Sequence, residues 1–150
     1  MDYKLISMFL GEYKHLVDIK GRVALPARFK VGLRRGLVIT RGLDNCLFVY
    51  PKDEWKKIAQ KLAQYSINQS NTRAFVRLML AGAMDVEIDS QGRIVIPDYL
   101  RKYAFIQQKT VIAGLYNRLE IWDEDRWEKY KTDTEKNSND IAERLGEVGV

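Results

Sequence analysis

Hydrophobic and polar positions alternate in short runs along much of the chain, and this pattern predicts a strand-rich protein. Val86 and Ile88 alternate with polar neighbours, as in a half-buried strand. Val23–Leu25 and Ile94–Ile96 are short apolar runs that favour strands. Further strands are predicted at Leu37–Thr40, Cys46–Tyr50, Thr110–Ala113 and Leu119–Trp122. Polar turns that contain glycine separate the members of these last pairs.

Helical spacing appears in fewer places. Trp55, Ile58 and Leu62 share one face of a helix predicted over Lys52–Tyr65. Short helices are predicted at Ala27–Leu33 and Asp98–Ala104, with Pro26 and Pro97 at their first positions. A polar loop is predicted at Ser66–Thr72, followed by a helix over Arg73–Ala81 that Asn71 or Thr72 would cap and Gly82 would end. Another helix is predicted to start near Asp123. From Lys131 onward aromatic residues disappear, which predicts a weakly helical or frayed tail.

The chain repeats itself once. The segment Asp18-Ile-Lys-Gly-Arg-Val-Ala-Leu-Pro26 returns as Asp89-Ser-Gln-Gly-Arg-Ile-Val-Ile-Pro97, 71 residues later. The match then resumes at a shift of 72, where Gly42, Leu43, Asn45, Leu47, Asp53 and Trp55 meet Gly114, Leu115, Asn117, Leu119, Asp125 and Trp127. This many ordered identities indicate a duplicated unit.

The duplication suggests how the chain is divided. We expect a first unit with its C-terminal helix at residues 8–66, a linking helix at 67–82, a second unit with its C-terminal helix at 83–131 and a tail at 132–150. A unit of about 50 residues buries too little apolar surface to be stable alone. The two copies are therefore expected to pack through a pseudo-twofold axis and share one core, in a β-rich α+β fold.

Each repeat contains a corner of the form Asp-x-x-Gly-Arg. Gly21 and Gly92 fit the tight connection, where glycine adopts a positive φ without strain. Asp18 and Asp89 can accept hydrogen bonds from nearby backbone N–H groups and hold Arg22 and Arg93 in a fixed direction. A guanidinium fixed in this way suits recognition of phosphate or guanine. The simpler alternative, in which the pair only closes the hairpin, stays open.

The charge distribution favours a polyanionic partner. The net charge is +5, and residues 1–41 hold nine Lys and Arg against three acids. Residues 123–150 hold five against nine, so the end of the chain is acidic. A basic face most often meets nucleic acid. An ordinary solvated surface explains a net charge of this size equally well.

The copies differ in charge at the corner. Lys20 becomes Gln91, and Arg28 becomes Tyr99. The first copy is therefore expected to supply more of the DNA contacts. Its candidates are Lys14, Lys20, Arg22 and Arg28, with Arg34 and Arg35 as further candidates. Lys14, Arg34 and Arg35 are also consistent with solvated charges.

The chemistry-bearing residues do not form a catalytic pattern. Cys46 aligns with Arg118 in the other copy, and the single histidine, His15, is expected to be structural. One cysteine and one histidine exclude an internal disulfide and a structural zinc site. Trp55, Trp122, Trp127 and Tyr50 recur at matched places, which favours core packing over base stacking. We expect no enzyme activity and no cofactor.

The sequence also indicates where the protein works. No apolar run reaches the roughly 18–20 residues that span a bilayer. The N-terminus has no pattern of a signal peptide. These features predict a cytoplasmic protein that does not enter a membrane.

The duplicated corner resembles the MraZ family, which is built from SpoVT/AbrB-like swapped-hairpin units. The resemblance rests on Met8-Phe-Leu-Gly-Glu-Tyr13, the motif Asp18-x-x-x-Arg22, Tyr50-Pro-x-x-x-Trp55, Arg77-Leu-Met-Leu-Ala-Gly-Ala83, the motif Asp89-x-x-x-Arg93 and Leu119-Glu-Ile-Trp122. It covers about residues 8–130, and residues 1–7 lie outside it. The two spaced motifs are specific together, whereas either alone is weak.

The resemblance implies a fold and a function. The fold would be two swapped-hairpin β-barrel units packed as an intrachain pseudo-dimer with flanking helices. The protein would be a transcription factor, located at the nucleoid, that regulates a gene cluster for cell division and cell-wall synthesis. It would bind direct repeats in double-stranded promoter DNA, including its own promoter. Asp18, Arg22, Asp89 and Arg93 would take part in DNA binding, and the chain would assemble with itself into a ring of about 8–12 subunits.

Two alternatives remain at this point. The chain could be a ring-forming interaction scaffold whose basic face is incidental. It could also be an antitoxin of the same fold, in which case a toxin gene would lie beside it.

Overall fold

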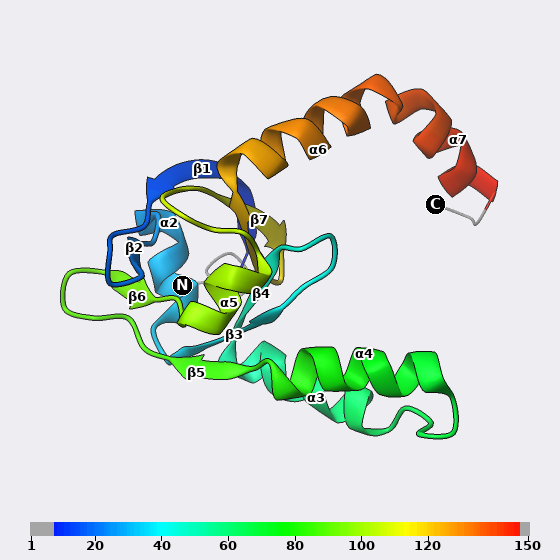
Figure 1. Cartoon of the computed structure of the whole chain (residues 1–150), viewed down its shortest axis with the longest axis horizontal. Helices are drawn as coiled ribbons and strands as arrows, with labels where there is room; N and C mark the ends of the chain where they lie inside the picture. The colour runs from blue at the N-terminus through cyan, green and yellow to red at the C-terminus, as the bar shows by residue number, and fades with distance from the viewer. Residues whose placement is uncertain (1–7, 148–150) are drawn as a thin grey trace.

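The computed structural model describes residues 8–147, and its strands form a six-stranded antiparallel sheet and a separate two-stranded ribbon (Figure 1). The strands of the sheet, in chain order, are β1 (Phe9–Leu16), β3 (Leu37–Arg41), β4 (Leu47–Pro51), β5 (Met84–Val86), β7 (Lys109–Tyr116) and β8 (Leu119–Asp123). The ribbon consists of β2 (Arg22–Ala24) and β6 (Arg93–Val95). The helical segments are α2 (Ala27–Lys30), η1 (Val31–Leu33), α3 (Lys52–Ala63), α4 (Ser70–Ala81), α5 (Asp98–Tyr103), α6 (Glu124–Lys136) and α7 (Ser138–Glu147).

The strand order shows that the two copies are interlocked. The sheet runs β1-β7-β8-β4-β3-β5. Strands β1, β3 and β4 of the first copy correspond to β5, β7 and β8 of the second, so the order is the same when read from either edge. The first strand of each copy pairs with the third strand of the other copy, and β4 meets β8 in the middle. This arrangement confirms the α+β class and the expected pairing of the copies about a pseudo-twofold axis.

The ribbon lies on the same pseudo-twofold axis. Val23 stands opposite Ile94 in the antiparallel register, and each side chain is only 1% exposed. The ribbon is extended by two backbone hydrogen bonds, from Ile96 N–H to the carbonyl of Gly21 (2.8 Å) and from Leu25 N–H to the carbonyl of Gly92 (3.1 Å). Each corner glycine therefore accepts a hydrogen bond from the other copy.

One hydrophobic core serves both copies. Its buried members come from both repeats and include Val17, Val23, Leu25, Phe29, Leu33, Ile94, Ile96, Leu100, Ala104 and Ile106. Phe9 and Tyr13 of β1 both pack edge-on against Phe29, with ring centroids 5.6 and 5.2 Å away. A shared core is the expected solution for units too small to bury enough surface separately.

A second, aromatic-rich cluster lies where the longer helices leave the sheet. Tyr50 and Trp122 are buried there, and Trp55 and Trp127 pack against them. The indoles of Trp122 and Trp127 meet edge to face at 5.4 Å. These aromatic residues therefore pack against one another, as the sequence predicted.

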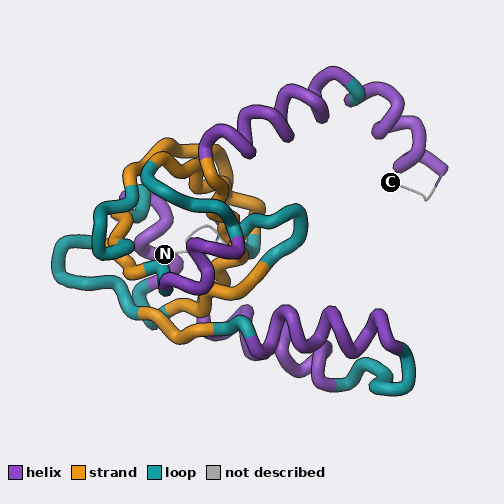
Figure 2. The backbone as a smooth tube through the Cα atoms, viewed as in Figure 1, coloured by secondary structure: helices purple, strands orange, loops and turns teal. Residues whose placement is uncertain are grey.

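Two helical arms project from the end of the molecule opposite the ribbon (Figure 2). One arm is the hairpin of α3 and α4, and the other is formed by α6 and α7. Helix α6 continues to Lys136 and α7 follows it, where a weakly helical or frayed tail was predicted. Asp123 stabilises the start of α6 by accepting a hydrogen bond from Arg126 N–H (3.1 Å), and Lys131 ties the helix to Glu12 of β1 (2.8 Å).

Several element boundaries differ from the sequence prediction. Pro26 and Pro97 precede helices α2 and α5 as N-caps with extended ψ angles of 137° and 148°, instead of occupying the first helical position. Helix α4 begins at Ser70, so neither Asn71 nor Thr72 caps it, although Gly82 does end it. The pairings of the six-stranded sheet form a linear order with β1 and β5 at its edges.

The shared core gives a stability prediction. Replacing Ile94, which is 1% exposed, by alanine removes apolar contacts at the centre of the ribbon. Ile94→Ala should lower the free energy of unfolding by about 2–5 kcal/mol. The measurement is urea unfolding followed by circular dichroism, with Val95→Ala as the control because its neighbour Val95 is 49% exposed. Equal losses in the two variants would contradict this account of the ribbon.

Candidate nucleic-acid interface

The first corner, residues 18–22, is a compact network built around one carboxylate. Gly21 adopts a φ of +82°, which lets the chain reverse within the turn. Asp18 Oδ1 accepts hydrogen bonds from the backbone N–H groups of Lys20 and Arg22, both at 2.9 Å. Asp18 Oδ2 accepts a hydrogen bond from Arg22 Nε at 2.7 Å. The carboxylate thus fixes both the turn and the arginine.

The second corner, residues 89–93, has the same network. Gly92 has a φ of +77°. Asp89 Oδ1 accepts hydrogen bonds from the N–H groups of Gln91 (2.8 Å) and Arg93 (2.9 Å), and Oδ2 accepts one from Arg93 Nε (3.0 Å). The predicted role of the aspartates in holding the arginines is confirmed at both corners.

These hydrogen bonds shift the titration of both carboxylates. The pKa of Asp18 lies below its ordinary value chiefly because Arg22 N–H donates a hydrogen bond to the charged form. Burial opposes this effect, and the Arg22 side chain and Lys20 N–H strengthen it. The backbone N–H of Arg93 lowers the pKa of Asp89 in the same way. Both carboxylates are therefore charged at neutral pH.

The ribbon places both arginines on one outward face. Side chains alternate along a strand, so the inward Val23 and Ile94 leave Arg22, Ala24, Arg93 and Val95 facing outward. In this register the Cα atoms of Arg22 and Arg93 are about 8 Å apart. Their side chains are 32% and 28% exposed, so each guanidinium keeps donors outside its aspartate clamp. The result is a rigid pair of cations on a two-stranded surface.

The other candidates of the first copy lie outside this face and have different surroundings. Lys20 is exposed at the tip of the first corner. Arg28 is exposed on α2, where its Nη1 donates a hydrogen bond to the hydroxyl of Tyr13 (3.1 Å). Lys14 lies on β1 beside two acids of α6, with Nζ 3.4 Å from Glu124 and 4.0 Å from Glu128. The acids already offset the Lys14 charge, and its contact with DNA stays a prediction.

The arginine pair after η1 was also a candidate. Arg34 and Arg35 are both exposed. Arg35 approaches Asp53 at 3.9 Å, a weak surface pair. Arg34 faces a hollow beside the second corner. The two neighbours therefore have different surroundings.

Two cations that the sequence analysis did not select lie directly over the corners. A methyl group built on Gly21 would come within 2.9 Å of Arg101 Cζ, and one on Gly92 would collide with the Lys30 ammonium group. Lys30 and Arg101 occupy matching positions in the two repeats, 71 residues apart. Each reaches the corner of the other copy. The alignment of the repeats shows that Lys30 and Arg101 are equivalent, but only the exchange of strands shows that each lies beside the corner of the other copy.

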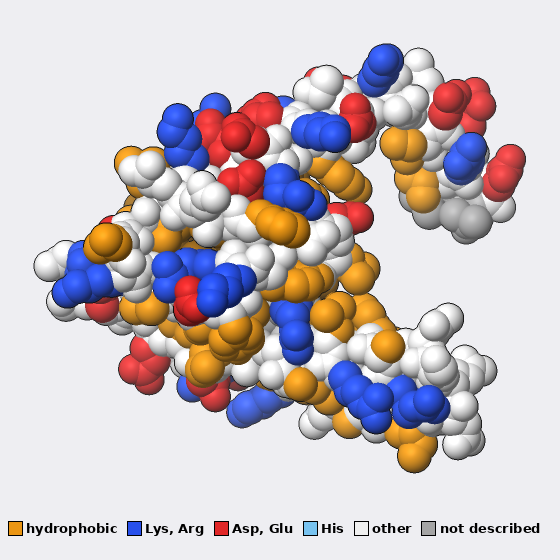
Figure 3. Space-filling view, in the orientation of Figure 1, with side chains coloured by type: hydrophobic (Ala, Val, Ile, Leu, Met, Phe, Trp, Pro, Cys, Tyr) orange, Lys and Arg blue, Asp and Glu red, His pale blue; other side chains and the backbone are white. Residues whose placement is uncertain are grey.

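Charge is unevenly distributed over the surface. Lys and Arg side chains lie at the end of the molecule that holds the ribbon and on the arm of α3 and α4, whereas acidic side chains are frequent along the arm of α6 and α7 (Figure 3). A polyanion would meet less repulsion at the ribbon than along this arm.

The remaining chemistry-bearing residues have structural surroundings. Cys46 is buried, and this burial raises the pKa of its thiol, which disfavours the reactive thiolate. His15 lies on β1, and burial followed by the charge of Lys30 lowers its pKa. Within residues 8–147 no three His, Cys, Asp or Glu side chains gather as metal ligands would. In the same range no helix has the length and apolar character to cross a bilayer.

Comparison with known proteins identifies the family. The chain matches the family described as “MraZ protein, putative antitoxin-like” twice, over residues 8–78 and 79–148. Together the two matches cover nearly the whole chain, and each contains one corner. The chain belongs to the MraZ family. The resemblance inferred from the two Asp-x-x-x-Arg motifs is confirmed.

Curated MraZ proteins align with the chain along its length. Proteins named “Transcriptional regulator MraZ” from Pediococcus pentosaceus, Natranaerobius thermophilus and Halothermothrix orenii are each 48% identical to it over 143 residues. The alignments cover 95% of this chain and 100% of each relative. The chain is thus a member of a family of transcriptional regulators, and that name does not denote a class of enzyme.

The corner carboxylates give a pH prediction for this MraZ protein. Their pKa values are lower in the fold than the ordinary value of 3.8. They therefore stabilise the fold above about pH 4, and this contribution is lost as the pH falls through the folded values. The double variant Asp18→Asn/Asp89→Asn should be less stable at pH 7 and should lose less stability on acidification. Urea titrations between pH 2.5 and 7 measure both effects, and parallel curves for variant and parent would contradict the assignment.

Proposed function

We propose that this protein is a sequence-specific DNA-binding transcriptional regulator that contacts duplex DNA with the outward face of the β2–β6 ribbon. The observation that carries the proposal is the pair of arginines, Arg22 and Arg93, each clamped by an aspartate and projecting from the same face. Family membership and the names of the relatives support regulation of transcription.

The dimensions of the ribbon suit the major groove. A B-DNA major groove is about 12 Å wide and admits a two-stranded β-ribbon. Arginine donors match the acceptors of guanine there, and they also match phosphate oxygens. Since each arginine is already held by its aspartate, less side-chain entropy is lost on binding. Lys20 and Arg28 flank this face as further contacts, and Asp18 and Asp89 act by positioning the arginines.

The biological target follows from the family resemblance. We propose that the protein binds direct repeats in promoter DNA of a division and cell-wall gene cluster, including its own promoter, and acts in the cytoplasm at the nucleoid. Direct repeats fit a protein that presents the same ribbon several times. The proposal is supported by the exposed ribbon and by the relatives' name as transcriptional regulators.

Self-assembly into a ring of about 8–12 subunits is the second part of the proposal. Exposed apolar side chains lie on the arms: Tyr65 and Ile67 after α3, and Ile141 and Leu145 four residues apart on α7. Side chains with this spacing share one helix face and suit packing against another subunit. Several tethered ribbons would then bind repeated sites at high effective concentration, which compensates for a modest charge on each subunit.

The DNA-binding proposal predicts a loss of function at the first corner. Arg22→Ala should abolish binding to the repeats upstream of the gene and leave the fold intact, because Asp18 keeps its two backbone hydrogen bonds. Fluorescence anisotropy with a labelled upstream duplex measures the affinity, and circular dichroism checks the fold. Arg77→Ala removes an equal charge from an exposed position on α4 and should bind normally. Normal binding by Arg22→Ala would remove the hypothesis.

Assembly has its own measurement. Light scattering coupled to gel filtration should give a mass of about 8–12 chains, and Ile141→Asp/Leu145→Asp should lower that mass while the circular dichroism of the subunit persists. A parent protein that elutes as a monomer at micromolar concentration would contradict the ring. It would leave the ribbon proposal standing, since that proposal is tested by anisotropy.

A further inference from the structure

The two corners differ in sequence but have nearly the same backbone geometry. The second corner carries Gln91 where the first has Lys20, and residues 83–122 hold five cations and five acids. Charge counted along the sequence therefore makes the second corner the weaker site. Charge counted in space gives a different result, because the strand exchange brings residues of the first copy to the second corner.

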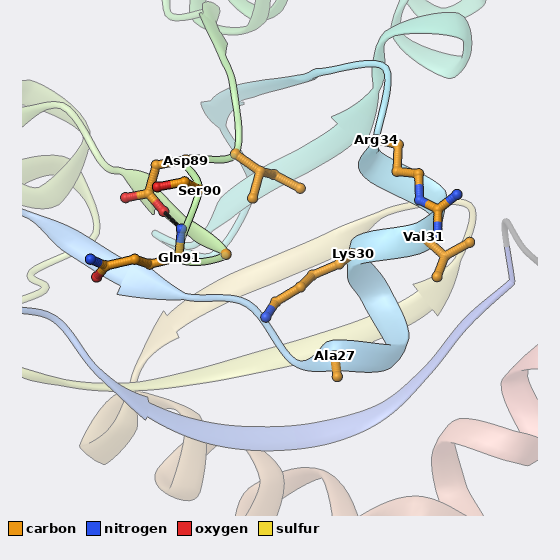
Figure 4. Close-up of a pocket in the computed structure, with 9 residues that line it drawn as sticks. Ala27, Lys30, Val31, Arg34, Asp89, Ser90 and Gln91 are labelled. Atoms are coloured by element: carbon orange, nitrogen blue, oxygen red, sulfur yellow. Dashed lines mark hydrogen bonds between the residues drawn. The ribbon is translucent and has the colours of Figure 1, made fainter.

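A hollow of about 630 Å³ lies beside the second corner. One side is formed by Ser90, Gln91 and Gly92 of the second copy, and the other by Lys30 and Arg34 of the first. Figure 4 shows Lys30 reaching from α2 toward the corner that carries Gln91, with Arg34 at the far end of the same hollow. Asp89 is an acid of this lining, and it is already paired with Arg93.

The first corner has a matching arrangement with a different charge pattern. Arg101 covers Gly21 as Lys30 covers Gly92, and its Nε donates a hydrogen bond to the carbonyl of Ile96 (3.0 Å). Asp98 lies 3.8 Å from Arg101 and 3.0 Å from Lys102, so an acid offsets part of this charge. At the second corner the position of Asp98 is taken by Ala27.

Each corner consequently has cations beside it in addition to its clamped arginine. At the first corner these cations are Lys20 in the turn and Arg101 over Gly21, and Asp98 partly offsets the charge of Arg101. Around the second, Lys30 and Arg34 line the hollow. Outside the aspartate clamps, two basic side chains therefore lie beside each corner. The hollow adds the hydroxyl of Ser90 and the amide of Gln91, both of which can donate hydrogen bonds.

We propose that this hollow binds a phosphate of the DNA backbone and that Lys30 and Arg34 of the first copy complete the second corner as a DNA-binding site. The inference rests on the proposed function, since it concerns the same ribbon and the same duplex. Cations and neutral donors in an open hollow suit a phosphodiester oxygen. The pseudo-twofold axis then presents two basic corners to the two sides of one groove. The second corner would thus contribute to binding although it has Gln91 in place of Lys20.

The test removes the two cations together. Lys30→Gln/Arg34→Gln should weaken binding to the upstream duplex at 0.15 M salt, roughly 5-fold for one lost phosphate contact and roughly 30-fold for two. The slope of log affinity against log salt should become shallower by about 0.9 for each contact. Fluorescence anisotropy at four salt concentrations gives both quantities. Lys57→Gln/Lys61→Gln is the matched control, because it removes the same charge from exposed positions on the α3 arm.

A gain-of-charge variant keeps the test decisive if the double variant does not fold. Gln91→Lys gives the second corner the lysine of the first, and it should bind more tightly with a slope steeper by about 0.9. Unchanged affinity and slope in both variants, while the parent binds and Arg22→Ala does not, would overturn this inference alone. No binding by the parent at any salt concentration would instead remove the proposed function.

Discussion

The pairing of β2 with β6 is the constraint on which the functional surface depends. Each of these strands has only three residues, and each finds its partner in the other copy. The pairing buries Val23 against Ile94 in the shared core and lets each corner glycine accept a hydrogen bond across the axis. Because hydrogen bonds hold both ends of this short ribbon and the core packs against its inner face, the ribbon has little freedom to bend. The packing of the core therefore fixes the position of one corner relative to the other.

Register converts this packing into a binding surface. Because side chains alternate along a strand, a slip by one residue would turn Arg22 and Arg93 toward the core and Val23 and Ile94 toward solvent. The burial of two aliphatic side chains therefore also fixes the direction of two arginines. Within each corner, the aspartate then sets the direction of the guanidinium group through its hydrogen bond with Nε. Stability and recognition thus rely on the same few residues.

Local features of this architecture could be predicted from the sequence, but contacts between the copies could not. The Asp18–Arg22 clamp lies within five residues, so the chemistry of the turn was sufficient to infer it. By contrast, the Thr110 hydroxyl donates to the carbonyl of His15 across 95 residues of chain, and no periodicity specifies such a partner. For the same reason the acids of α6 beside Lys14 and the position of Lys30 over Gly92 were not foreseen. The sequence shows which copy contains each of these cations, whereas only the folded structure shows which corner each cation lies beside.

The strand exchange has a consequence for how the duplicated chain can change. In a homodimer, a substitution alters both corners at once, whereas here Lys20 and Gln91 differ and yet basic side chains lie beside both corners. The compensation comes from α2, whose residue Ala27 replaces the acid found at Asp98 and whose neighbour Arg34 has Phe105 as its counterpart. Each corner is thus an assembly of both copies, so a charge lost from one repeat can be restored by the other. Helix α6 lies apart from the ribbon, and its acids Glu124 and Glu128 offset part of the Lys14 charge on β1. In the proposed function, a duplex that approaches this surface would meet both corners on one face.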